Sequence, residues 1–122
     1  MFKRAIPKPT QAEQDRQDRA RACGCIACRI EICVQPLSTE IHHQTQSGRQ
    51  ISQRHTVALC SWHHRAICVP GMTRTEMERE YGPSLHRPRK FFERYGDNAE
   101  QLQFQDELIG YEPLELPRRN VA

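Results

Sequence analysis

Cysteine and histidine side chains occur in two pairs with the same spacing. Cys25 and Cys28 lie three positions apart in GCIAC, and Cys60 and His63 lie three positions apart in LCSWH. Thiolate and imidazole ligands with two intervening residues allow a tight turn and a helix start to close a tetrahedral zinc site. These four residues are therefore predicted to bind a structural Zn²⁺. Spacing alone leaves Cys23 open as a substitute for Cys25.

The histidines predict a second site. Five of the six fall within one short stretch of the chain. Adjacent residues on a helix point about 100° apart, so if His63 faces the zinc, His64 must face elsewhere. The preceding segment brings His42, His43 and His55, and strand neighbours such as His42 and His43 diverge unless a bulge re-aims one. Each histidine alone fits an ordinary hydrogen-bonded position, whereas the group predicts a catalytic centre.

Phosphodiester hydrolysis is the chemistry that such a centre suits. A divalent ion can hold a phosphate oxygen and stabilise the charge that grows on the leaving oxygen. A neutral histidine can accept the proton of an attacking water, since its pKa of about 6.5 leaves it mostly unprotonated at neutral pH. Imidazole ligands reduce the need for carboxylates, and Glu40 is the only acidic residue between positions 39 and 68.

The elements that must position these residues follow from residue type and spacing. Two β-prone runs, at about 39–43 and 55–59, are predicted to pair as a hairpin. A helix is expected to begin at Ser61 and to end before VPGM. Capping boxes, a first-turn proline and closing glycines predict further helices at about 11–22, from Thr73 to Tyr81, from Pro88 to Gly96, and from Asp97 to Gly110. The order of elements predicts a small α+β domain.

The domain is expected to cover residues 23–110, with a basic arm and helix at 1–22 and a tail at 111–122. The helix near 11–22 has almost no apolar face, so one interpretation is that it orders only on a partner. Hydrophobic residues make up 37% of the 122-residue chain, and a core this poor commonly needs a staple such as a metal. Trp62, Phe91, Phe92 and Tyr95 are expected to pack in that core, whereas His86 is expected to be exposed.

Composition also bears on compartment. No run approaches the roughly 18 apolar residues of a membrane span, and the N-terminus lacks an apolar stretch of signal-peptide length. We therefore expect a cytoplasmic protein without a membrane partner, whose six cysteines serve as metal ligands before disulfides. The alternative is that they are reduced, buried thiols. Cys33 and Cys68 have no assigned role.

The charge distribution suggests a polyanionic partner. Residues 23–96 contain ten Lys/Arg and six Asp/Glu, whereas residues 97–122 contain two and six. Clustered cations attract phosphate-bearing partners, although an ordinary solvated surface is the alternative. The residues expected to contact nucleic acid are Arg54, Arg65, Arg87, Arg89 and Lys90, with Arg94 on the same basic helix face as the last three.

Together these motifs resemble the HNH (ββα-metal) endonucleases. More closely, GCIACR, EIHHQT, HTVALCSWHHRA and YGPSLHRPRKFFERYG are similar to the phage and prophage recombination-enhancement (Ref-type) RecA-dependent nucleases. The resemblance covers about residues 20–110. It implies a zinc-stapled ββα-metal core with flanking helices. Matched position by position, it makes Cys25, Cys28, Cys60 and His63 the zinc ligands, His42 and His64 the catalytic-metal ligands, His43 the general base and His55 the residue that orients or supports the site.

The resemblance also implies partners and leaves alternatives. It implies DNA as substrate, a RecA-type recombinase filament as partner and the cytoplasm of a bacterial host as location. The catalytic ion is expected to be Mg²⁺, Mn²⁺ or another transition metal. In the superfamily, asparagine is commoner at the position of His55, and aspartate is common at the position of His42. A site with only imidazole ligands should favour softer ions. The rival hypotheses are a catalytically silent, zinc-stapled DNA-binding module and an RNA-directed or structural phage protein.

Overall fold

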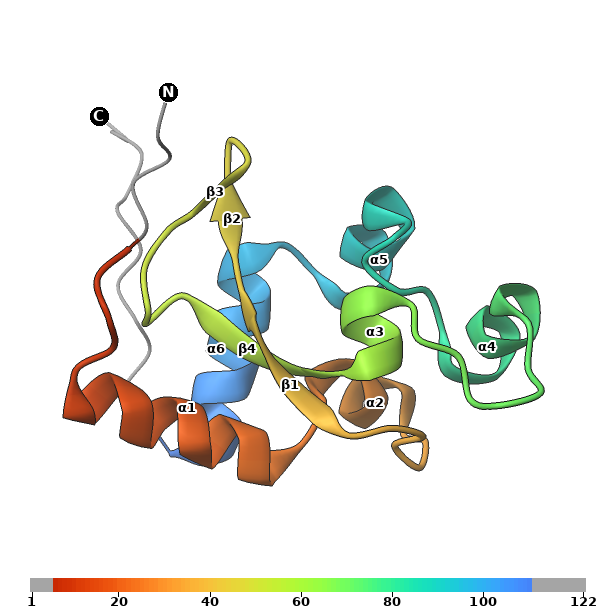
Figure 1. Ribbon diagram of the computed structural model, residues 1–122, viewed down its shortest axis with the longest axis horizontal. Coiled ribbons are helices and arrows are strands. Elements are labelled where there is room, and N and C mark those ends of the chain that lie inside the picture. Colours follow the sequence, from red (N-terminus) through yellow and green to blue (C-terminus); the bar gives the residue numbers. More distant parts are fainter. Residues whose placement is uncertain (1–5, 111–122) are drawn as a thin grey trace.

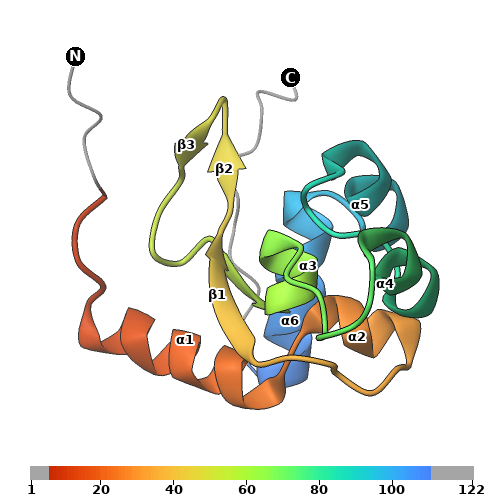
Figure 2. The same cartoon turned by 45° about the vertical axis from the view of Figure 1, so that its right-hand side comes forward.

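The structure, a computed structural model, describes residues 6–110. The predicted tail at 111–122 and the first five residues of the predicted arm lie outside the described residues. The chain forms, in order, α1 (Gln11–Cys23), α2 (Ile26–Glu31), β1 (Thr39–His43), β2 (Thr45–Gln46), β3 (Arg49–Gln50), β4 (Thr56–Cys60), α3 (Ser61–Arg65), α4 (Arg74–Tyr81), α5 (Pro88–Tyr95) and α6 (Asn98–Ile109) (Figure 1 and Figure 2). No helix in this part of the chain is both long and apolar enough to cross a membrane.

A hairpin followed by a short helix forms the centre of the molecule. Strands β1 and β4 pair antiparallel, with Thr39 opposite Cys60 and His43 opposite Thr56. This confirms the predicted pairing, with the second strand beginning one residue later than expected. Because α3 starts at the residue after β4, the strands and the helix form a ββα unit. Helix α3 ends at Arg65, where Ala66 takes a left-handed backbone with φ of 57°.

The segment that joins the two strands is not a simple loop. Strands β2 and β3 pair as a second, two-residue ribbon, which projects from the hairpin in both views (Figure 1 and Figure 2). Its turn residues Ser47 and Gly48 both have positive φ, the conformation that two-residue hairpin turns require. The buried Gln44 links the two ladders through its backbone. Its backbone N–H donates to His55 O at 2.9 Å, and its backbone carbonyl accepts from the Ile51 N–H at 3.2 Å.

Strand β4, all of whose residues are buried, lies at the centre of the helical packing. Helices α1, α2, α3 and α6 all contact it, and α6 lies behind the hairpin in Figure 1. Trp62 is fully buried, as its predicted position in the core requires. Its indole N–H donates to Gly82 O at 2.9 Å. Phe91 and Tyr95 are buried too, but Phe92 is 36% exposed. The prediction of a core position was therefore wrong for Phe92, which lies on the outer side of α5.

Helix α1 packs through polar groups. The side chains of Arg16 and Gln17 are buried although the helix has no apolar face. Arg16 Nη2 lies 2.6 Å from Asp106 Oδ1 on α6, and Arg16 Nη1 donates to the carbonyl and hydroxyl oxygens of Thr56 on β4. The interpretation that this helix orders only on a partner was wrong, because its partners are β4 and α6 of the same chain.

Candidate metal centre and histidine cluster

Four buried side chains form a possible tetrahedral metal site. The ligand atoms of Cys25, Cys28, Cys60 and His63 all lie within 4.8 Å of one another. Zinc–sulfur bonds of about 2.3 Å and zinc–nitrogen bonds of about 2 Å at tetrahedral angles would separate two sulfurs by about 3.8 Å, and sulfur from nitrogen by about 3.5 Å. Here Cys28 Sγ and Cys60 Sγ are 3.9 Å apart, and His63 Nδ1 lies 3.5, 3.5 and 3.3 Å from the three sulfurs. The donor set and spacings fit zinc.

The four side chains come from the starts of two short helices, α2 and α3. Cys25 is the N-cap of α2, where its sulfur accepts from the Cys28 amide at 3.4 Å. Cys60 ends β4 and is the N-cap of α3, which places His63 in the first turn of that helix. Helix α2, which the sequence did not predict, therefore begins beside Cys25 of the possible metal site. Cys23 is only partly buried at the end of α1 and is not part of the group, so the first ligand is Cys25.

The surroundings of the group support metal binding. His63 Nε2 lies 2.8 Å from Tyr81 O and 3.3 Å from the Tyr95 hydroxyl, so the N–H at Nε2 leaves the Nδ1 lone pair for the ion. Hydrogen bonds among the sulfurs of Cys25, Cys28 and Cys60, together with burial, raise the pKa of the Cys28 thiol. A bound divalent cation would oppose this rise in pKa, because it stabilises the thiolate form of the three cysteines.

His64 turns away from this group and meets His42. Their ring centroids lie 5.1 Å apart with an interplanar angle of 62°. Both side chains are partly buried, and burial, followed by the charges of His64 and His43, lowers the pKa of His42 from 6.5 to about 4. The predicted divergence of His63 and His64 is thus present, and His42 and His64, from β1 and α3, are brought together. A neutral imidazole pair of this kind can bind a metal ion.

Glu40 joins the histidine pair, a role that the sequence analysis missed. Its Oε1 lies 2.9 Å from His64 Nδ1, and its Oε2 accepts from Ser61 Oγ at 3.0 Å. Arg65 approaches both carboxylate oxygens, with Arg65 Nε 2.8 Å from Oε1. The Arg65 guanidinium, with the contacts of His64 and Ser61, lowers the pKa of Glu40 to about 2 against a smaller effect of burial. Period-two alternation along β1 would have indicated the contact, since Glu40 and His42 share a face.

His43 has a different partner. Its Nε2 lies 2.8 Å from Gln53 Oε1, which also accepts from Gln17 Nε2 at 3.1 Å. Gln53 Nε2 donates to Pro7 O at 2.9 Å, which fixes its oxygen toward His43. His43 therefore has its proton on Nε2 and a free lone pair on Nδ1. Gln53 is a second residue that the sequence analysis missed, and no local pattern marks it.

His55 lies just before β4, away from these contacts. Its Nδ1 is 2.6 Å from Ser52 Oγ, and its buried Nε2 has no hydrogen-bond partner among the described residues. Burial, followed by the charges of Arg16 and Arg54, lowers the pKa of His55. Within residues 6–110 no hydrogen bond joins His55 to His43, so its supporting role stays a prediction.

Most of the predicted DNA-contacting cations are paired with carboxylates. Arg65 contacts Glu40, and the remaining pairs are Arg87 with Glu78 at 2.7 Å, Arg89 with Glu93 at 3.4 Å and Arg94 with Glu31 at 2.6 Å. Lys90 is exposed beside these pairs on α5. His86 is exposed, as expected, and contacts Ser84 and the Trp62 ring.

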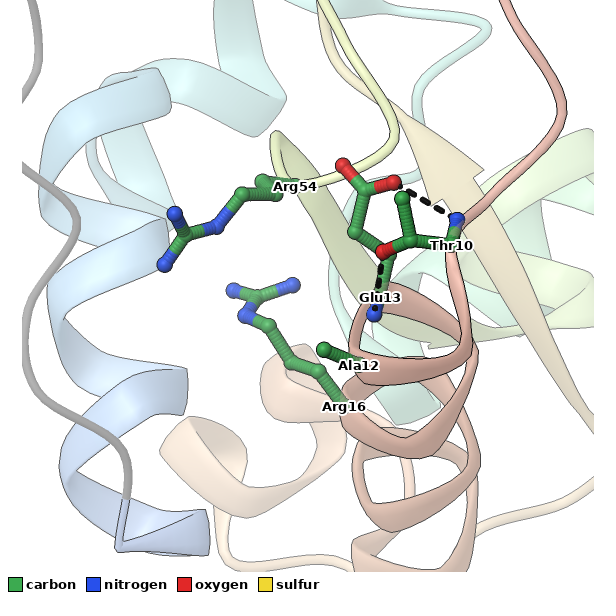
Figure 3. A pocket seen from close by; sticks show the side chains of 5 residues that line it. All are labelled: Thr10, Ala12, Glu13, Arg16 and Arg54. Carbon is green, nitrogen blue, oxygen red and sulfur yellow. Dashed lines mark hydrogen bonds between the residues drawn. The ribbon is translucent and has the colours of Figure 1, made fainter.

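Arg54 lines a pocket on another part of the surface, beside the start of α1. Figure 3 shows the side chains of Arg54 and Arg16 extending into a space between the start of α1 and the segment before β4. The pocket has a volume of about 370 Å³ and is lined by Thr10, Ala12, Glu13, Arg16 and Arg54. Glu13 is held in the capping box with Thr10, and Arg16 is paired with Asp106, so within residues 6–110 no ion pair engages the Arg54 guanidinium in this pocket.

Comparison with known protein families gives a match for this chain. The model of one protein family, described as recombination enhancement, RecA-dependent nuclease, matches residues 9–110. The chain belongs to this family. Membership in the RecA-dependent nuclease family implies nuclease action on DNA in recombination and dependence on RecA. No curated protein and no solved structure matches the chain. The match begins two residues before α1 and ends at Gly110, and so includes every helix and strand described above.

Proposed function

We propose that this member of the RecA-dependent nuclease family is an HNH-type, metal-dependent DNA endonuclease that acts in phage or prophage recombination. The observation that carries the proposal is the contact of His42 with His64, with ring centroids 5.1 Å apart, on a ββα unit whose helix also provides Cys60 and His63 to the four-ligand group. The four-ligand group is proposed to stabilise the fold, whereas His42 and His64 are proposed to bind the catalytic ion.

His42 and His64 are the proposed ligands of the catalytic divalent ion. The two rings belong to strand β1 and helix α3, and burial lowers the pKa of His42, so its lone pair stays available at neutral pH. A divalent ion bound there supplies positive charge against the phosphate and leaving oxygens of a phosphodiester. Mg²⁺, Mn²⁺ or another transition metal is proposed, and the imidazole ligands favour the softer ions.

His43 is the proposed general base. Gln53 holds its Nε2, which leaves Nδ1 to accept a proton from an attacking water. His43 is the last residue of β1, next to the point at which Gln44 links the two ladders. The scissile phosphate is therefore proposed to lie at this end of β1, where neighbouring residues supply a metal ligand and a base.

DNA binding is proposed to be electrostatic and independent of sequence. Arg54, Arg89 and Lys90 are the proposed phosphate contacts, because Arg65 and Arg87 are engaged with carboxylates across elements. Phosphate contacts position DNA without reading bases. Sequence choice would then come from the RecA filament, in line with the family's description.

A plasmid assay tests the proposal. Protein that contains its structural zinc is incubated with supercoiled plasmid, naked or paired with a RecA-coated oligonucleotide, with and without added Mg²⁺ or Mn²⁺. Cleavage should require the added ion and should be greater with RecA. His42→Ala and His64→Ala should abolish it, whereas the exposed His86→Ala should not.

The same assay separates the rival hypothesis. If the wild-type protein binds DNA but leaves both substrates intact with every ion, the silent DNA-binding module is correct. If His42→Ala and His64→Ala cleave as fast as the wild type, the active site lies elsewhere.

A further inference from the structure

We propose that Glu40 is a positioning residue: it holds the proton of His64 on Nδ1 and thereby directs His64 Nε2 toward the ion shared with His42. The proposal rests on the proposed function only in taking His64 as a metal ligand.

The hydrogen bonds of Glu40 define what it can do. Four donors reach its two oxygens: His64 Nδ1 and Arg65 Nε at Oε1, and Ser61 Oγ and Arg65 Nη2 at Oε2. A carboxylate offers about four lone-pair sites, so these contacts occupy them. An ionised carboxylate only accepts, so His64 Nδ1 must be the donor. Glu40 thus acts on the site through His64 rather than as a ligand.

The strand and helix fix the relative positions of the three groups. Glu40 and His42 lie two residues apart on β1 and so project from the same face. His64 on α3 contacts both of them, through a hydrogen bond to Glu40 and an edge-on ring contact to His42. With Nδ1 on the carboxylate, Nε2 on the other side of the ring is free for an ion. Carboxylate–histidine–metal arrangements of this type raise the basicity of the ligand and fix its orientation.

Arg65 belongs to the same arrangement. It binds Glu40 through two guanidinium nitrogens, a fork geometry that suits a carboxylate. The contact keeps the carboxylate beside His64 although Arg65 itself is 58% exposed. Arg65, which the sequence suggested as a DNA contact, therefore orients Glu40 in this structure.

The tautomer of His64 is the first measurement. Long-range ¹H–¹⁵N spectra of the protein that contains only its structural zinc report which ring nitrogen of His64 holds the proton. The wild type should have it on Nδ1, and Glu40→Ala should lose this preference. The control Glu80→Ala removes the same charge from an exposed position on α4 and should match the wild type. A proton on Nε2 in the wild type, or no change in Glu40→Ala, would overturn the proposal.

Affinity for a second ion is the other measurement, made with Mn²⁺ by electron paramagnetic resonance and without DNA. Glu40→Ala should weaken Mn²⁺ binding by roughly 10–100-fold, the usual effect of losing such a partner, with zinc content unchanged. If Glu40→Ala loses its zinc, Glu40→Gln replaces it, and its Mn²⁺ affinity should fall at least several-fold. Loss of all Mn²⁺ binding with an unchanged His64 tautomer would make Glu40 a ligand and would overturn the proposal, as would an unchanged affinity.

These results can be told apart from failure of the proposed function. Mn²⁺ binding and the His64 tautomer are measured without cleavage, so both can follow expectation in a protein that never cuts DNA. In that case the endonuclease proposal alone fails. A wild-type protein that binds no second ion overturns both proposals.

Discussion

His63 and His64 are neighbours in the chain, yet their rings serve different groups. His63 Nδ1 lies 3.3 Å from Cys60 Sγ inside the four-ligand group, whereas His64 Nδ1 lies 2.9 Å from Glu40 Oε1 beside His42. The rotation of about 100° per helical residue produces this division in a helix only five residues long. One short helix thus connects the possible metal site to the site proposed for catalysis.

The two histidines should therefore differ in phenotype. His63→Ala should lose zinc and most of the folded structure, because the free energy of metal binding contributes to folding in a domain of this size. His64→Ala should keep zinc and a native circular dichroism spectrum and should lose only the second ion. Metal analysis and thermal melting check this. The same loss of zinc in both variants would mean that the histidines share one site.

The choice between Cys25 and Cys23 can be tested in the same way. Cys25→Ser should lose the zinc, because it removes one of the four ligands. Cys23→Ser is a matched control, since Cys23 lies outside the group. It should retain stoichiometric zinc and the wild-type melting temperature. Equal zinc loss in the two variants, or a Cys25→Ser protein with full zinc, would contradict this assignment.

Arg16 should contribute strongly to stability. The side chains of its ion pair with Asp106 are 3% and 1% exposed; Arg16 contacts Asp106 Oδ1, and Asp106 Oδ2 has no hydrogen-bond partner among the described residues. Arg16→Ala would leave a buried carboxylate without its counter-charge, which costs about 3–5 kcal/mol. The exposed Arg21→Ala, which breaks a surface pair with Asp18, should cost at most about 1 kcal/mol. Urea unfolding measures both, and similar small losses would show that α1 packs weakly.

Acid should destabilise the protein through His42. Its pKa is about 4 in the folded chain and 6.5 ordinarily, so the unfolded chain binds more protons between these values. Stability conferred by neutral His42 is therefore present above pH 6.5 and is lost as the pH falls toward 4. Relative to His42→Gln, the wild type should lose about 1 kcal/mol of unfolding free energy between about pH 7.5 and 5.5. A pH-independent difference would mean that His42 titrates normally.

Local signals predicted much of this structure. The capping boxes of Thr10, Thr73 and Asp97 place helix starts where they occur, because each cap bonds to a backbone amide three residues away. The CxxC and CxxH pairs likewise predict the four-ligand group, since each spacing is set by one turn of chain.

Other features depend on partners far away in the sequence. Arg16 is buried because Asp106 lies opposite it, 90 residues later, so α1 looked unable to pack. Helix α2 has only six residues, and the ribbon of β2 and β3 has two residues per strand; both are too short for a periodic signal in the sequence. Gln53 contacts His43 only because the segment before β4 folds back along β1.

His43 is the proposed proton acceptor, so its replacement tests the proposed chemistry most directly. His43→Ala removes the base but no proposed ligand, and zinc content, Mn²⁺ binding and DNA binding should match the wild type. Its single-turnover cleavage of RecA-paired plasmid should fall by roughly 10²–10⁴-fold, the usual contribution of a general base. A His43→Ala protein that cleaves at the wild-type rate, in a preparation where His64→Ala is inactive, would contradict the assignment of His43 as the base.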